Sequence, residues 1–124
     1  MKKFKVLIFT EEYSVNVLIG ARIELKNELR KYTGFSMKSI ERDFDGRGIT
    51  YNCYPEKHPI IAIDGDLIIP VCLATLAHES VHALDYLMAH ISINANETEF
   101  RAHGVAAIFR VVLENILKKK NPPQ

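Results

Sequence analysis

Five consecutive residues, His78-Glu79-Ser80-Val81-His82, carry the strongest chemical signal in the chain. On a helix, residues four positions apart lie one turn above each other, so both imidazoles can reach one metal ion. Glu79 is rotated aside, where it can take a proton from a water that the metal activates. This HExxH spacing predicts a zinc site with His78 and His82 as ligands and Glu79 as general base.

The motif requires a helix that buries its opposite face. At about 100° per residue, with His78 at zero, His82 falls near 40° and Asp85 near −20°. An apolar stripe lies on the other side, formed by Leu73, Leu76, Ala77, Val81, Leu84, Leu87 and Met88. Pro70 suits the first turn of this helix, which we expect to run to about His90.

A catalytic zinc normally has a third protein ligand and leaves its fourth position to water. No histidine follows at the HExxHxxGxxH spacing, so Glu97 and Glu99 are the candidates on the next helix. We favour Glu99, which begins a helix that would return antiparallel, with His103 one turn further along the same face. Residues 96–99 also resemble a capping box, in which Glu99 would instead bind the start of the helix.

Two polar residues near these candidates have two interpretations each. Asp85 shares the face of His82 and could orient that ligand, or it could be a solvated carboxylate. His103 could line the cleft and help stabilise an oxyanion, as a second catalytic residue beside Glu79, or it could be a buried structural histidine. His58 and His90 are more typical of surface histidines than of ligands.

The elements around the motif predict a single α+β domain over residues 1–124. A small, mostly antiparallel sheet is expected to pack against the HExxH helix and a C-terminal helix. Expected strands are residues 6–9, their hairpin partner 13–19, then 49–54 and 59–64. Expected helices are residues 21–32, ended by Gly34, the HExxH helix, and a last helix from Asn94 or Asn96 toward residues 118–120.

Composition excludes several classes of protein. The 124 residues are 48% hydrophobic and 25% charged, with a net charge of +1, so no basic field attracts nucleic acid. Cys53 and Cys72 form no CxxC pair and are expected to be free thiols, with a single disulfide between them as the alternative. The N-terminal apolar run stops at Thr10, too early for a signal peptide, and no segment is long enough to span a bilayer. We expect a soluble cytoplasmic protein with no membrane partner.

The motif and its surroundings resemble the gluzincin type of zincin metallopeptidase. The chain is similar to the small ImmA/IrrE-type peptidases and to short HExxH proteins encoded by phages and prophages. The resemblance is carried by residues 73–86 and, more weakly, by residues 96–103, which lack the Glu-Ala-Asn-x-Phe-Ala wording of the ImmA/IrrE type. It implies Zn²⁺-dependent hydrolysis of a peptide or protein substrate in a bacterial cell or a phage-infected host.

Two other functions remain open. The chain could be a zinc-binding interaction or host-modulating protein without robust protease activity, or a metal-free interaction domain. For the peptidase, the substrate is expected to extend along an exposed strand edge, and residues 59–64 are the nearest candidate in sequence.

Overall fold

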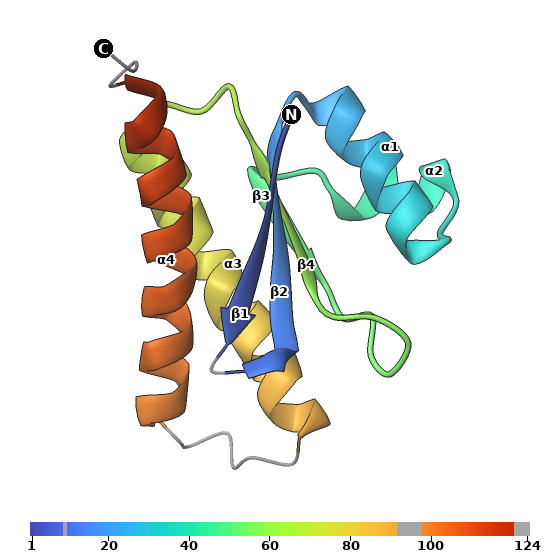
Figure 1. The fold of residues 1–124 in the computed structure, drawn as a ribbon. Coiled ribbons are helices and arrows are strands. Elements are labelled where there is room, and N and C mark those ends of the chain that lie inside the picture. The colour runs from blue at the N-terminus through green and yellow to red at the C-terminus, as the bar shows by residue number, and fades with distance from the viewer. Residues whose placement is uncertain (9, 92–97, 121–124) are drawn as a thin grey trace.

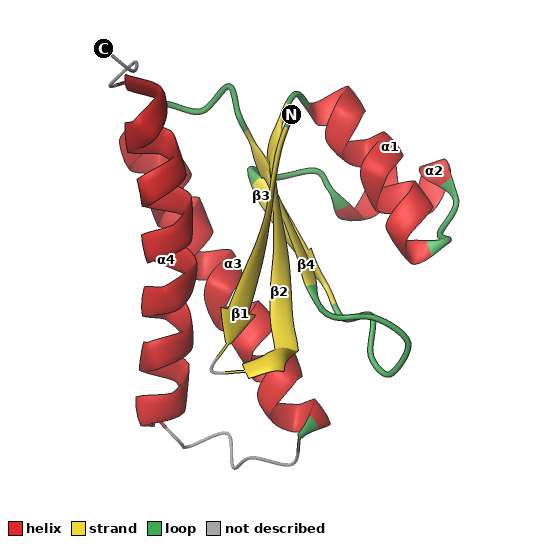
Figure 2. Cartoon of the chain, in the orientation of Figure 1, coloured by secondary structure: helices red, strands yellow, loops and turns green. Residues whose placement is uncertain are grey.

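Along the described part of the chain, two strands are followed by two helices, then by two more strands and two long helices. The computed structural model describes residues 1–8, 10–91 and 98–120. The elements, in chain order, are β1 (Lys2–Ile8), β2 (Thr10–Gly20), α1 (Arg22–Thr33), α2 (Met37–Asp43), β3 (Gly48–Tyr51), β4 (Ile60–Asp64), α3 (Ile69–His90) and α4 (Thr98–Lys120) (Figure 1). Figure 2 shows the strands as one sheet between two pairs of helices.

The four strands form a mixed sheet in the order β1-β2-β4-β3. The expected hairpin is confirmed, because β1 and β2 pair antiparallel, and β3 pairs antiparallel with β4. The inner pair, β2 and β4, is parallel, with Asn16 opposite Ile60. The predicted α+β class with a mostly antiparallel sheet is therefore confirmed, and one parallel pair is added to it.

Helices cover both faces of this sheet, whereas the sequence predicted packing only by the HExxH helix and the C-terminal helix. α3 packs against β3 and β4, α4 packs against β1 and α3, and α1 packs against β2 and β4. Alternate residues of β4 point to opposite faces of the sheet and pack into two separate hydrophobic cores. Ile61 and Ile63 join the core under α3 and α4, while Ile60 and Ala62 join the core under α1. This strand is buried on both faces, which explains its continuous apolar sequence.

Residues 35–44 contain a helix that the sequence analysis did not predict. Ser36 caps α2, because its side chain accepts a hydrogen bond of 3.2 Å from the backbone N–H of Ser39. The helix buries Ile40, and its end leads through Phe44 toward β3. The preceding helix ends as expected at Gly34, whose φ of 78° is left-handed and suits glycine.

β3 is shorter than predicted, and it lies at an edge of the sheet where β4 does not. It ends at Tyr51, after which the side chain of Asn52 accepts a hydrogen bond from the N–H of Tyr54 and turns the chain. β3 is an edge strand, while β4 is paired on both sides. The expectation that residues 59–64 offer a free edge is therefore wrong, and β3 provides that edge beside the HExxH helix.

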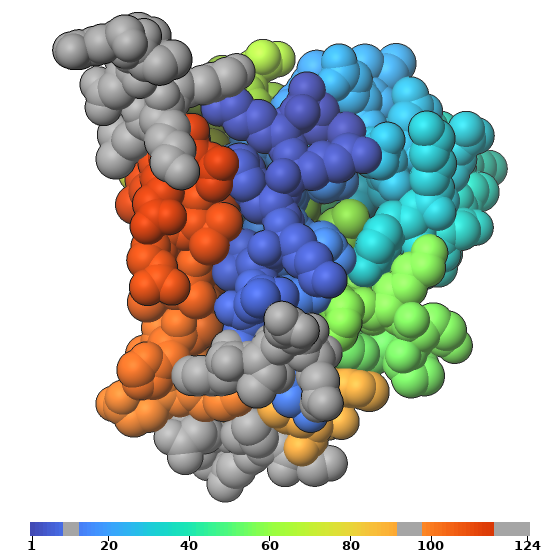
Figure 3. All heavy atoms as spheres, in the orientation of Figure 1, coloured from blue at the N-terminus to red at the C-terminus, as the bar shows by residue number. Residues whose placement is uncertain are grey.

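α3 confirms the predicted HExxH helix, with Pro70 in its first turn and His90 at its end. Leu76, Leu84 and Leu87 are buried as expected, but Val81 is 39% exposed and lies outside the buried stripe. α4 packs along α3 and continues to Lys120. The proposed caps Asn94 and Asn96 lie outside the described residues. Figure 3 shows α4, the β1–β2 hairpin and α1 side by side across one face of the molecule.

Candidate metal centre

His78 and His82 point toward each other on the solvent side of α3. Their Nε2 atoms are 3.2 Å apart, and their rings meet edge to face with centroids 4.8 Å apart. Two nitrogens bound to one tetrahedral zinc at 2.0–2.1 Å lie about 3.3 Å from each other. The pair therefore has the separation that a shared zinc requires, although the same distance also permits an N–H···N hydrogen bond without metal.

Glu79 lies beside this pair but is largely buried, with 8% of its surface exposed. Its Oε1 accepts a hydrogen bond of 2.8 Å from the hydroxyl of Thr50 on β3. Its Oε2 lies 3.9 Å from Nε2 of His78. One carboxylate oxygen is thus held by the sheet, and the other is turned toward the histidines.

A close approach of β3 to α3 makes the contact with Glu79 possible. A Cβ added at Gly48 would lie 2.7 Å from Cγ2 of Thr75 and 3.2 Å from Cγ of Glu79, so only glycine fits without displacement. The loop before Gly48 is anchored by Arg22, whose guanidinium donates to the carbonyl of Gly46 at 2.6 Å and to that of Phe44 at 2.8 Å. The start of α1 therefore fixes where β3 begins.

Of the two interpretations that the sequence left open for Asp85, its role as a partner of His82 is not the one that the structure supports. Arg101 of α4 donates to Oδ1 of Asp85 from Nη2 at 2.7 Å and from Nε at 3.1 Å. This ion pair joins α3 to α4. Asp85 therefore holds α3 and α4 together through Arg101, and it does not orient His82.

Glu99 and His103 lie away from the histidine pair. Their side chains are 83% and 67% exposed, and His103 Nε2 lies 3.9 Å from Oε2 of Glu99. Each is two positions from Arg101, which places it about 200° around the helix from the side that meets Asp85. The interpretation of His103 as a buried structural histidine does not fit this exposure.

The position of Glu99 along α4 also places it away from the histidine pair. Gly104 packs on Leu84, and the two helices are antiparallel, so Glu99 lies beside the end of α3 rather than beside His78. The structure therefore does not bring Glu99 to the pair. Glu97, the alternative ligand, lies outside the described residues. Within residues 1–8, 10–91 and 98–120, no group of three or more His, Cys, Asp or Glu side chains is arranged to hold a metal ion.

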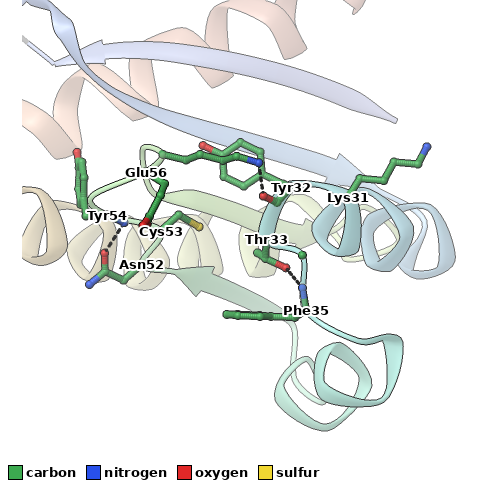
Figure 4. A pocket seen from close by; sticks show the side chains of 10 residues that line it. Lys31, Tyr32, Thr33, Phe35, Asn52, Cys53, Tyr54 and Glu56 are labelled. Carbon is green, nitrogen blue, oxygen red and sulfur yellow. Dashed lines mark hydrogen bonds between the residues drawn. The ribbon is translucent and has the colours of Figure 1, made fainter.

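A pocket of about 400 Å³ lies between the end of α1 and the loop after β3, apart from the HExxH residues (Figure 4). Phe35, Cys53 and Lys57 are among the residues that line it, and Lys57 donates to the carbonyl of Tyr32 at 2.6 Å. Burial raises the pKa of the Cys53 thiol, which disfavours the reactive thiolate. Cys53 and Cys72 are both free thiols, as expected.

The chain matches no family model, no curated protein and no solved structure. Among the helices that are described, none is long and apolar enough to cross a membrane.

Proposed function

We propose that this chain is a zinc-dependent peptidase in which His78 and His82 hold the metal and Glu79 is the general base. The observation that carries the proposal is the 3.2 Å separation of the two Nε2 atoms beside the buried carboxylate of Glu79. A structural zinc site needs ligands but no base, and it favours a closed shell of four ligands, often with cysteine. The described surroundings of the pair offer a base and leave the metal side open to solvent.

The roles of the residues follow from their positions. Zinc, when bound, polarises a carbonyl and brings the pKa of water toward neutrality. Oε2 of Glu79 accepts the proton of the attacking water and returns it to the leaving amine. A substrate in extended form pairs its backbone with the free edge of β3, which places a peptide bond near Glu79.

The proposal assigns two protein ligands, since those are the two that lie together. Glu99 could reach the metal beside His78 and His82 only if α4 rotated about its own axis. That rotation would expose Ile108 and Val112, which are buried on the inner face of α4. The packing of Gly104 on Leu84 opposes such a turn. The third ligand of the usual catalytic set is therefore not assigned to a residue of α4.

Metal analysis combined with two substitutions tests this function. We expect the purified protein to bind about one zinc per chain, and His82→Ala to lose that zinc. Glu79→Gln should keep the zinc and the fold while hydrolysis of fluorophore-labelled casein falls about 10²–10⁴-fold. Zinc binding that survives in His82→Ala would exclude the proposed site, and full hydrolysis by Glu79→Gln would exclude the proposed base.

A second candidate is a zinc-binding interaction protein without peptidase activity. It is favoured by the exposure of the pair, since the side chain of His78 is 70% exposed and no third ligand from the described residues covers the metal side. This function predicts stoichiometric zinc, loss of zinc in His82→Ala, and no hydrolysis in either the wild type or Glu79→Gln.

A further inference from the structure

We infer that Thr50 is the positioning residue for Glu79, and that β3 therefore both receives the substrate and holds the general base in place. The inference rests on the proposed function for the role of Glu79. It concerns a residue 29 positions earlier in the chain, on a different element. No HExxH motif contains this residue, and its effect is exerted through Glu79 alone.

The geometry of the contact is that of a well-formed hydrogen bond. The hydroxyl of Thr50 lies 2.8 Å from Oε1 of Glu79 and 3.1 Å from the backbone carbonyl of the same residue. Both distances fall within or close to the usual range for hydroxyl donors. A bond to a carboxylate is stronger than one between neutral groups, so the shorter contact is the one that the ionised base favours.

A glutamate needs such a restraint to act as a base. Its long side chain has several rotatable bonds, and holding it in one conformation costs entropy. Catalytic groups must stay within about 0.5 Å of the productive position, and a displacement of about 1 Å can cost about 100-fold in rate. With Oε1 tied to Thr50, Oε2 keeps its place on the side of His78, 3.9 Å from Nε2.

The position of Thr50 also links substrate and base. β3 lies at one edge of the sheet, and its other side is paired with β4, with Thr50 opposite Ile61. A peptide that adds to the free edge therefore lies along the same four-residue strand that anchors Glu79. The distance between the bound backbone and Oε2 is then set by one rigid element.

Two substitutions at Thr50 separate the hydroxyl from the shape of the side chain. Thr50→Val keeps the volume and the β-branch but removes the donor, while Thr50→Ser keeps the donor and removes a methyl group. We expect Thr50→Val to lower kcat for labelled casein about 10–100-fold with little change in KM, and Thr50→Ser to restore most of it. Zinc content should stay the same in both, since Glu79 is not a ligand.

A second measurement does not depend on hydrolysis. Crystal structures of the metal-free variants should show Glu79 in one rotamer in Thr50→Ser and in several rotamers in Thr50→Val. A single unchanged rotamer in Thr50→Val, or equal kcat in the two variants, would overturn the inference. If the wild type binds zinc but hydrolyses nothing, the proposed function fails while the rotamer result still decides the role of Thr50.

Discussion

At the scale of single residues, Glu79, predicted as the base, and Glu99, predicted as a ligand, occupy very different environments. Glu79 is 8% exposed and bonded to the sheet, whereas the side chain of Glu99 is 83% exposed. A base must be held in place, and a ligand must face its metal. The structure meets the first condition for Glu79 and does not meet the second for Glu99.

Replacing Glu99 tests its exclusion from the centre. In the described arrangement it faces away from His78, so we expect Glu99→Gln to bind zinc with unchanged affinity in a competition titration with a chelator. Glu97→Gln, made in parallel, examines the other candidate. A clear loss of affinity in Glu99→Gln would mean that α4 adopts a different rotation when zinc binds.

Asp85 is expected to affect the fold rather than the metal. Its bond to Arg101 is partly exposed, so Asp85→Asn should lower the free energy of unfolding by about 1 kcal/mol or less. Chemical denaturation with zinc and with chelator measures this. The loss should be the same in both conditions, because Asp85 does not contact the ligands. A loss that appears only with zinc would restore Asp85 as a support for His82.

The sequence could predict the part of the site that lies on one helix. The HExxH spacing and the apolar stripe of α3 determine which way His78 and His82 face, since both depend only on helical geometry. Thr50 could not be found in this way, because its contact with Glu79 depends on how the sheet meets the helix. The direction of Glu99 depends in turn on the packing of Gly104 against Leu84, for which the sequence carries no local signal.

At the scale of elements, the distance between β3 and α3 depends on the absence of a side chain at Gly48. Gly48→Ala should push the strand from the helix, because the new Cβ would lie 2.7 Å from Thr75. We expect a loss of about 1–3 kcal/mol in stability and a fall in hydrolysis beyond that of Thr50→Val. Gly46→Ala is the matched control, since no atom lies within 4 Å of its added Cβ.

The contact between α3 and α4 makes a second prediction at this scale. Alanine in place of a helical glycine normally stabilises by about 1 kcal/mol. At Gly104, however, the added Cβ would lie 2.2 Å from Cδ1 and 2.8 Å from Cγ of the fully buried Leu84. We therefore expect Gly104→Ala to lower the Tm. The double variant with Leu84→Ala should relieve the clash, but the core volume that Leu84 filled is not restored. A higher Tm for Gly104→Ala alone would contradict this close packing.

Strand and helix predictions succeeded where the pattern was local. The β1–β2 hairpin, α1 and α3 each followed from period and caps in one segment. α2 was not predicted because it is only seven residues long and buries one side chain, Ile40. The parallel pairing of β2 with β4 joins distant segments, and no local pattern specifies it.

At the scale of the whole molecule, the loop after β3, which contains Tyr54 and His58, contacts the end of α3. The ring of His58 meets that of Tyr54 edge to face at 6.0 Å, and Tyr54 stacks on His90 at 3.9 Å. Burial lowers the pKa of His58, and the nearby charges of Lys5 and His90 lower it further. The unfolded chain therefore takes up this proton more readily than the folded protein.

The sign of the pH dependence follows from linkage. A histidine whose pKa is lowered in the folded state contributes fully to stability above the unfolded pKa of about 6.5, and this contribution is lost as the pH falls below it. We expect the free energy of unfolding to decrease between about pH 7 and pH 5 in the presence of chelator. The slope should be smaller in His58→Gln. An equal slope in the two proteins would show that other groups cause the loss.

The parallel contact between β2 and β4 has a consequence for the order in which the chain folds. The hairpin of β1 and β2 and the antiparallel contact of α3 with α4 close short loops, whereas the inner pair joins Asn16 to Ile60. Loop-closure entropy must be overcome before such a distant pairing is rewarded, so contacts of this kind slow folding. The antiparallel pair of β3 and β4 is local as well, so it can form before β2 and β4 pair. The pairing of β2 with β4 joins the β1–β2 hairpin to this second local unit, so we expect it to be the late step of folding.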